Sequence, residues 1–176
     1  MRIISGTYKG RHINPPKNIT ARPTTDFAKE SLFNLLTNRI DYEDCSVLDL
    51  FSGTGSISFE FVSRGVRDVI AVELAHTQQN FIIATSKALG IRNLTVIRAD
   101  VFKYLRSCAI KFDIIFADPP YTLDNIPEIP DIIFENQLLT DNGWLILEHS
   151  ANNDFTSHPH FVEHRVYGNV NFSFFQ

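Results

Sequence analysis

The chain has 176 residues, of which 44% are hydrophobic and 20% charged, and its formal net charge is −4. This length suits one domain with a full core, and the composition excludes a disordered chain. The negative charge argues against a generally basic nucleic-acid binder. Two cysteines give no disulfide framework, and no apolar run suits a signal peptide or a membrane span, so we expect a cytoplasmic protein.

The charge is unevenly distributed along the chain. All 20 acidic residues follow residue 25, whereas residues 1–25 contain only basic ones: Arg2, Lys9, Arg11, Lys17 and Arg22. A basic arm on an acidic body can bind phosphates, although charge alone favours an ordinary solvated surface.

The predicted elements begin with a hairpin over residues 3–13, in which two short strands flank a glycine-bounded turn. A linker over residues 14–18 follows, and then a helix that Thr24 or Thr25 can cap and that runs to about Asn38.

From residue 46, short apolar strands alternate with helices, a pattern that predicts a mostly parallel, doubly wound sheet. The predicted strands cover residues 46–51, 69–73, 94–97, 112–117 and 143–148. The predicted helices run to Arg64, from Thr77 to Gly90, from Asp100 to Leu105 and from Ile129 to Leu139. The tail predicts an antiparallel edge hairpin, with strands 162–167 and 170–174 joined at Gly168-Asn169.

Four successive strands of this predicted sheet each end in a carboxylate, namely Asp49, Glu73, Asp100 and Asp118. Ligands of open α/β sheets bind at the carboxyl ends of the strands, so these four side chains would line one crevice. Glu73 can accept hydrogen bonds from both hydroxyls of a ribose, and Asp100 from an adenine amino group. Taken singly, each is equally well explained as a helix cap.

The turn after the first of these strands reads D-L-F-S-G-T-G over residues 49–55. Glycines there let a ligand approach the backbone, and the following helix N-terminus offers free N–H groups. A dinucleotide fingerprint would need glycine at Ser58, and Asp49 would repel a pyrophosphate. A carboxylate suits a cation instead, such as the amino group of a methionine-like tail, which favours S-adenosylmethionine over NAD.

The fourth strand leads directly into Asp118-Pro119-Pro120-Tyr121. The prolines stop the strand, because neither has an N–H for the sheet. Asp118 and the Pro119 carbonyl can accept hydrogen bonds from the amino group of a planar base, while Tyr121 stacks on its face. The plainer explanation is a strand-ending turn with Tyr121 in the core.

Together, D-L-F-S-G-T-G, V-E, R-A-D and D-P-P-Y resemble S-adenosylmethionine-dependent methyltransferases that modify exocyclic amino groups. Three further segments resemble the RsmD-type bacterial 16S rRNA guanine-N2 methyltransferases, so that the resemblance covers nearly the whole chain: M-R-I-I-S-G-T-Y-K-G-R, R-P-T-T-D-x-x-K-E-S-L-F-N and R-V-Y-G-N-V.

The resemblance implies an α/β fold: a Rossmann-like, seven-stranded methyltransferase sheet with an antiparallel C-terminal hairpin and an N-terminal β-hairpin extension. Residues 1–23 would form the basic extension and residues 24–176 the methyltransferase domain. The implied cofactor is S-adenosylmethionine, and the implied partner is 16S rRNA or the small-subunit particle. We expect a monomer that needs neither a membrane nor a metal.

The resemblance also assigns roles to residues of this chain. The motif that holds the methionine moiety of the cofactor is matched by Asp49, Gly53 and Gly55, and Phe51 is also assigned to cofactor binding. Glu73 matches the ribose acceptor, and Asp100 with Val101 matches the adenine position. The target-base motif, which is the implied catalytic set, is matched by Asp118, Pro119, Pro120 and Tyr121, and Asp118 also borders the cofactor.

The N-terminal part of the resemblance concerns RNA. Arg22 and Thr24 match a segment that closes over the cofactor and approaches RNA, and the implied RNA-binding residues are Arg2, Lys9, Arg11, Arg22 and Lys29. The family usually has arginines at positions 27 and 29; here Lys29 keeps the charge and Phe27 does not.

Three other readings stay open. The first is an adenine-N6 methyltransferase acting on DNA or RNA, and the second is a ribosome-assembly factor that binds RNA without catalysis. The third, a nucleotide-dependent oxidoreductase, is weakened by Ser58 and Asp49. A metal site at His158, His160 and His164 is not expected, because no cysteine or carboxylate cluster completes a tetrahedral set.

Overall fold

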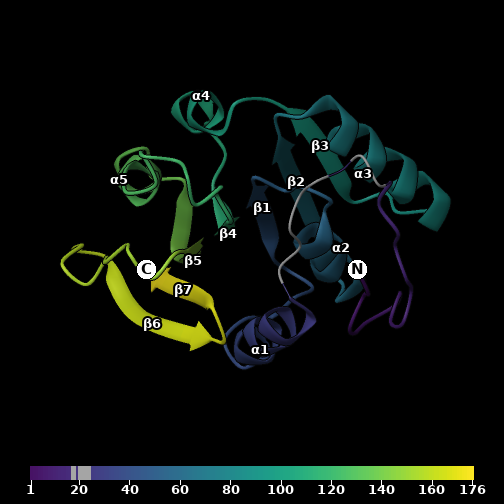
Figure 1. The fold of residues 1–176 in the computed structure, drawn as a ribbon, viewed down its shortest axis with the longest axis horizontal. Coiled ribbons are helices and arrows are strands. Elements are labelled where there is room, and N and C mark those ends of the chain that lie inside the picture. The colour runs from purple at the N-terminus through teal and green to yellow at the C-terminus, as the bar shows by residue number, and fades with distance from the viewer. Residues whose placement is uncertain (17–18, 20–24) are drawn as a thin grey trace.

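The computed structural model describes residues 1–16, 19 and 25–176. Figure 1 shows a central sheet with helices on both faces. The helices of the described residues are α1 (Asp26–Thr37), α2 (Ser56–Ser63), α3 (His76–Leu89), α4 (Val101–Ser107) and α5 (Glu128–Glu135). The strands are β1 (Ser46–Leu50), β2 (Asp68–Glu73), β3 (Leu94–Arg98), β4 (Phe112–Ala117), β5 (Leu139–His149), β6 (Phe161–Tyr167) and β7 (Val170–Phe175).

The seven strands form one sheet in the order β3-β2-β1-β4-β5-β7-β6. Strands β1 to β5 pair in parallel, whereas β7 runs antiparallel to both β5 and β6. The predicted seven-stranded α/β sheet and its antiparallel C-terminal hairpin are confirmed.

Side chains of β1 separate two hydrophobic cores. Leu48 and Leu50 join residues of α4 and α5, whereas Val47 joins residues of α1 and α2 on the other face. Successive side chains of a strand point to opposite faces, so a strand covered on both sides is apolar throughout. All five residues of β1 are buried, including Asp49, the one charged residue in the strand. The core therefore holds β1, and the turn that follows it, in a fixed place.

The N-terminal residues 1–13 form a closed loop held by one antiparallel β-bridge, between Arg2 and His12, rather than the two strands predicted. Ile3 and Ile13 pack with Phe59 of α2 and Ile82 of α3. Gly6 has a φ of +80°, and a Cβ there would lie 1.7 Å from the backbone oxygen of Ser63. Glycine at position 6 therefore lets this loop lie directly on α2.

The helix predicted over residues 129–139 is wrong at its C-terminal end. Helix α5 stops at Glu135, and Gln137 has a left-handed backbone with a φ of 52°. The Leu138 N–H then bonds to the Ile133 carbonyl at 3.0 Å, as in a helix C-cap. Strand β5 begins at Leu139 instead of residue 143, and an irregular register beside β4 accommodates the extra residues.

Candidate active site

A cavity of about 1050 Å³ opens at the carboxyl ends of the parallel strands. It is bordered by the turn after β1, the end of β2, the start of α4, the segment after β4, the end of β5 and the β6–β7 turn. Strands β1 and β4 are neighbours, and the helices that follow them lie on opposite faces of the sheet. The cavity thus lies at the topological switch point, where α/β sheets bind their ligands.

The turn after β1 has an unusual backbone. Phe51, Gly53 and Gly55 have φ values of 58°, 55° and 77°. For Phe51 this left-handed conformation costs about 1–2 kcal/mol, and such strain concentrates at functional sites. A Cβ at Gly55 would lie 3.0 Å from the Phe59 ring and 3.1 Å from Ile82. The positive φ and the packing of the turn against α2 and α3 therefore both favour glycine at position 55.

Asp49 is buried beneath that turn. Its Oδ2 accepts hydrogen bonds from the backbone N–H of Ser58, at 3.1 Å, and from the Ser58 hydroxyl. Burial raises the pKa of Asp49 to about 7, and the nearby charge of Glu73 acts in the same direction, while the bonds from Ser58 oppose it. Ser58, which breaks the dinucleotide fingerprint, is thus the residue that anchors this carboxylate. At neutral pH a cationic ligand would favour its ionised form.

Glu73 joins two turns at the cavity edge. Its Oε2 accepts from the Gly53 N–H and its Oε1 from the Ala75 N–H, both at 2.8 Å. A carboxylate has about four acceptor positions, so these bonds do not exhaust its capacity. The predicted contact of Glu73 with a ribose stays a prediction. The structure adds a second role for Glu73, which is to hold the turn over residues 51–55, called the glycine turn below.

Asp100 is the N-cap of α4, where its Oδ1 accepts from the Lys103 N–H at 3.0 Å. The capping role that the sequence left open is therefore real. Asp100, Val101 and Phe102 all line the cavity, and Phe102 packs edge-on against Phe51 at a centroid distance of 6.4 Å. This places the predicted adenine-binding residues beside the glycine turn.

The tetrapeptide after β4 forms the other side of the cavity. The Asp118 N–H bonds to the Leu50 carbonyl at 3.4 Å, which joins the tetrapeptide to the end of β1. Pro119 is buried, whereas Tyr121 is 46% exposed, and all four residues line the cavity. Tyr121 is therefore a cavity-wall residue, and the reading that placed it in the core is excluded.

Sequence reasoning missed Glu148, which also lines this side of the cavity. Glu148 lies in β5, is 4% exposed, and accepts a hydrogen bond from the Tyr121 hydroxyl at 3.0 Å. The signal was present, because W-L-I-L-E continues the series of strands that end in a carboxylate.

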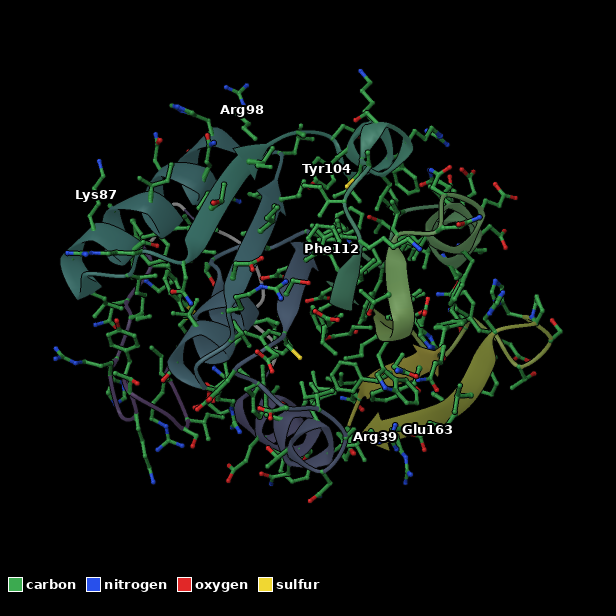
Figure 2. All side chains as sticks on the ribbon, turned by 180° about the vertical axis from the view of Figure 1, so that it is seen from behind. Arg39, Lys87, Arg98, Tyr104, Phe112 and Glu163 are labelled. Carbon is green, nitrogen blue, oxygen red and sulfur yellow. The ribbon has the colours of Figure 1, made fainter. Side chains whose placement is uncertain are left out.

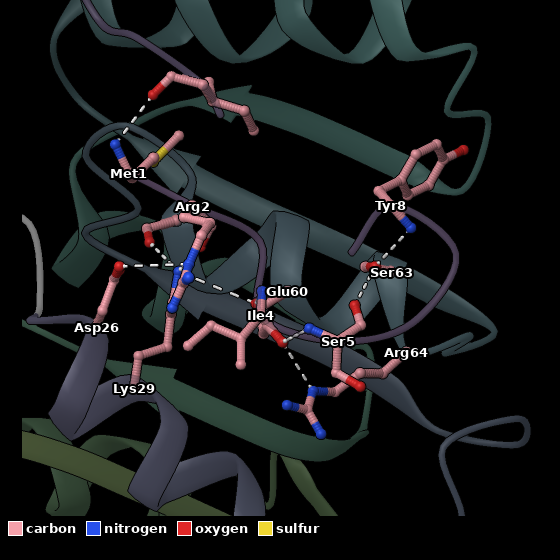
Figure 3. Close-up of polar contacts among 12 residues, drawn as sticks. Met1, Arg2, Ile4, Ser5, Tyr8, Asp26, Lys29, Glu60, Ser63 and Arg64 are labelled. Atoms are coloured by element: carbon pink, nitrogen blue, oxygen red, sulfur yellow. Dashed lines mark hydrogen bonds and ion pairs between the residues drawn. The ribbon is translucent and has the colours of Figure 1, made fainter. Parts of the chain in front are cut away.

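Lys29, predicted to contact RNA, is buried, and this corrects the prediction. Its Nζ donates to the Arg2 carbonyl at 2.7 Å and to the Ser56 hydroxyl at 3.1 Å, and lies 4.0 Å from Glu60 (Figure 3). Burial lowers its pKa, partly offset by Glu60. The ammonium group cannot reach RNA from this position; instead it supports Ser56, the first residue of α2.

Glu60 links the N-terminal loop to α2. Although it is fully buried, its carboxylate accepts from the Ile4 N–H at 2.8 Å, the Ser5 N–H at 3.1 Å and the Arg64 Nε at 2.9 Å (Figure 3). With Lys29 beside it, the charge is well compensated. We refer to Lys29, Glu60 and Arg64 as the buried cluster.

The remaining RNA-binding predictions are placed as follows. Arg2, Lys9 and Arg11 are exposed on the N-terminal loop, and Arg2 pairs with Asp26 at 3.8 Å. Arg22 and Thr24 lie outside the described residues. Thr25 caps α1 by accepting from the Ala28 N–H at 3.2 Å.

Phe27, which stands where the family usually has an arginine, lines the cavity and is 65% exposed. Its ring packs edge-on against Tyr167, next to the β6–β7 turn, at a centroid distance of 6.4 Å. The cavity mouth therefore has an aromatic wall on the side of the C-terminal hairpin.

No group of three or more His, Cys, Asp and Glu side chains in residues 1–16, 19 and 25–176 is arranged to hold a metal. His158 instead pairs with Asp131 at 3.3 Å, and His160 stacks on Phe134. At the outer edge of the sheet, Arg39 pairs with Glu163 of β6 (Figure 2). Among the helices of the described residues, none is both long and apolar enough to cross a membrane.

The chain is similar to known proteins along nearly its whole length. The Ribosomal RNA small subunit methyltransferase D of Buchnera aphidicola is 33% identical over 149 residues, which cover 84% of this chain and 75% of that protein. The protein of the same name from Escherichia coli K12 is 28% identical over 159 residues, covering 90% and 79%. The solved structure of yhhF from Escherichia coli superimposes with a TM-score of 0.87 at 26% identity, covering 100% and 97%.

The Rossmann-like methyltransferase fold expected from the sequence is thus confirmed. The profile of one family, described as Conserved hypothetical protein 95 (Cons_hypoth95), matches residues 1–176. With a seven-stranded sheet, a glycine turn and D-P-P-Y around one cavity, the chain belongs to the Cons_hypoth95 family.

Proposed function

We propose that this protein transfers a methyl group from S-adenosylmethionine to the exocyclic N2 of a guanine in 16S ribosomal RNA. Relatives named Ribosomal RNA small subunit methyltransferase D support methylation of ribosomal RNA. The choice of guanine N2 is the finer part of the proposal, and it rests on the resemblance of the N-terminal segments and of D-P-P-Y. The observation that carries the proposal is that one cavity contains both the glycine turn and Asp118–Tyr121.

The side of the cavity formed by β1, β2 and α4 suits the cofactor. Asp49 would hold the amino group of the methionine moiety, Glu73 the ribose hydroxyls, and Asp100 with Val101 the adenine. Gly53 lines the cavity without a side chain, so a ligand can approach its backbone. When bound, S-adenosylmethionine supplies the methyl group: its S–CH₃ bond breaks as the N–CH₃ bond forms, and the sulfonium becomes a thioether.

The side formed by Asp118–Tyr121 suits the base. The lone pair of the guanine amino group is delocalised into the ring, so the protein must orient it. Asp118 and the Pro119 carbonyl would accept its N–H bonds and hold the nitrogen in line with the methyl group. Positioning of this kind contributes up to roughly 7–11 kcal/mol. The nitrogen becomes acidic as it gains the methyl group, and its proton then passes to Asp118 or to solvent at the cavity mouth.

Tyr121 would stack on the face of the base, which contributes about 1–3 kcal/mol. The base must leave its own stack to enter the cavity, so the substrate is a loop, a single strand or a flipped nucleotide. The exposed Arg2, Lys9 and Arg11, with Arg22, would bind phosphates and add affinity without reading sequence.

The runner-up is an adenine-N6 methyltransferase, because D-P-P-Y also suits adenine. The N-terminal segments disfavour it, because they resemble the RsmD-type rRNA enzymes, whereas D-P-P-Y is shared with DNA adenine methyltransferases. A ribosome-assembly factor without catalysis would need neither the strained turn at Phe51 nor D-P-P-Y beside it.

Mass spectrometry of nuclease-digested ribosomal RNA, from cells with and without this protein, tests the proposal. We expect the loss of one N2-methylguanosine from 16S rRNA when the protein is absent, and its return on complementation. Loss of an N6-methyladenosine would establish the runner-up instead. An unchanged set of methylated nucleosides would support the non-catalytic factor.

A further inference from the structure

Two carboxylates lie on neighbouring strands at the base side of the cavity. Strands β4 and β5 pair in parallel, with Phe116 opposite Ile146 and Ala117 opposite Leu147. Asp118 directly follows β4, Glu148 is the residue of β5 after Leu147, and both line the cavity. The sheet therefore presents two acidic side chains next to each other where the target base would enter.

Glu148 is held at a defined place relative to the aromatic ring of the motif. It is buried, in register with Phe172 of β7, and its Oε1 accepts from the Tyr121 hydroxyl at 3.0 Å. A base stacked on the ring of Tyr121 would thus have the Glu148 carboxylate near its edge. A carboxylate accepts about four hydrogen bonds, so a bond from Tyr121 is compatible with one from the base.

The chemistry of the two purines differs at the edge that these carboxylates would face. Guanine presents two adjacent donors, its N1–H and its N2 amino group, whereas adenine presents an amino group next to an N1 lone pair. Enzymes that act on flipped bases read this Watson–Crick edge by hydrogen bonds. An ionised carboxylate accepts from guanine N1–H and repels the N1 lone pair of adenine.

We infer that Glu148 is a specificity-determining residue, which accepts the N1–H of the target guanine while Asp118 and the Pro119 carbonyl hold its amino group. This inference rests on the proposed function and deepens it. Tyr121 then acts twice, as the stacking surface and as the donor that holds Glu148 in place.

The test uses 2-aminopurine, which keeps the amino group of guanine, has a lone pair in place of the N1–H and lacks the O6 oxygen. The full-length protein would methylate 16S rRNA prepared from cells that lack it, assembled with either guanine or 2-aminopurine at the mapped target position. Incorporation of labelled methyl groups gives kcat/KM for each RNA. We expect the wild-type protein to prefer guanine roughly 10- to 100-fold, the discrimination typical of a good contact to a base edge.

Glu148→Gln is expected to lower kcat/KM for guanine. It should also reduce the guanine preference to within about threefold, because the glutamine amide can donate a hydrogen bond to the N1 of 2-aminopurine. The change in this ratio separates the contact from any intrinsic difference in reactivity between the two bases. Glu135→Gln, an exposed change at the end of α5, is the matched control and should leave both rates unchanged.

Equal wild-type rates on the two RNAs would overturn the inference, as would a guanine preference that Glu148→Gln leaves intact. Binding of S-adenosylmethionine, measured by calorimetry, checks that the variant folds. If it does not bind, Tyr121→Phe removes the hydrogen bond between Tyr121 and Glu148 but keeps the ring. We then expect a severalfold loss of preference, and no loss contradicts the inference. Failure of the proposed function is distinct, since the wild-type protein would then produce no N2-methylguanosine.

Discussion

The two sides of the cavity are built differently. On the cofactor side, Asp49, Glu73 and Asp100 each accept a hydrogen bond from a backbone N–H, so their positions follow from the path of the chain. On the base side, Glu148 is bonded to the side chain of Tyr121, whose ring is partly exposed. The first side is fixed by the backbone, whereas the second depends on contacts between side chains.

The residues that pack around the two sides of the cavity differ as well. The buried cluster lies behind the cofactor side, where Lys29 bonds to Ser56 at the start of α2. The cavity is also lined by Phe27 and by the β6–β7 turn, where Phe27 packs against Tyr167. Substitutions on the two sides should therefore have different effects. Those on the base side should alter catalysis, and those on the cofactor side should alter ligand affinity or stability.

Asp118→Ala should show the largest effect and define the base side. Because the variant loses the acceptor that orients the amino group, we expect methyl transfer to ribosomal RNA to fall by about 10²- to 10⁴-fold. Binding of S-adenosylmethionine, measured by calorimetry, should stay within about twofold, since the contacts of the cofactor side remain. Asp124→Ala, an exposed carboxylate in the same segment, is the control. Near-wild-type transfer by Asp118→Ala would contradict the assigned role.

Lys29→Met should have the next largest effect, on stability. Removing one partner from a buried ion pair costs about 3–5 kcal/mol, and the lower end applies because Glu60 keeps Arg64 and two backbone donors. Urea unfolding monitored by circular dichroism measures this loss. Lys9→Met, on the exposed loop, should change the free energy of unfolding by less than about 0.5 kcal/mol. If Lys29→Met were as stable as wild type and only RNA binding fell, Lys29 would be an RNA contact after all.

The sequence predicted the features that depend on neighbouring residues. The glycine turn, the proline-terminated strand and the carboxylates at strand ends are each encoded within a few positions, and parallel pairing brings them to one edge. The predicted end of a helix was wrong where the conformation of a single residue determines it. Gln137 follows the end of α5 with a left-handed φ that the neighbouring sequence did not indicate.

Lys29 illustrates what sequence patterns could not provide. A lysine near the start of a helix ordinarily lies on its solvated face, and its burial depends on the N-terminal loop crossing α1 and on Glu60 of α2 being buried as well. These contacts join segments about 30 residues apart. Glu148 was missed for a different reason: its pattern was visible, but only its position beside Asp118 and Tyr121 gives it a role.

The pH dependence of cofactor binding tests the cofactor side through Asp49. Burial raises its pKa from 3.8 to about 7, so the folded protein retains a proton that the unfolded chain loses, and the stability contributed by this group falls as the pH rises from about 4 to 7. An amino group binds the ionised carboxylate, so affinity for S-adenosylmethionine should increase with pH below 7, by up to about tenfold per unit. Calorimetry between about pH 5.5 and 7.5 measures this slope.

Asp49→Asn is the matched variant for that experiment. It should flatten the pH profile below pH 7 and weaken binding by about 1.5–3 kcal/mol, which is the contribution of a hydrogen bond to a charged group. A profile that keeps its slope in Asp49→Asn would show that another group titrates.

Tyr121→Phe should produce the smallest effect, and it separates the two roles of this ring. The variant keeps the stacking surface and loses only the hydroxyl that holds Glu148, so we expect methyl transfer to fall by about 1 kcal/mol, or roughly fivefold. Tyr121→Ala removes stacking as well and should cost a further 1–3 kcal/mol or so. Steady-state assays on 16S rRNA, with cofactor binding as the control for folding, distinguish the two. If both variants lost the same activity, the hydroxyl would carry the whole effect, and the base would not stack on Tyr121.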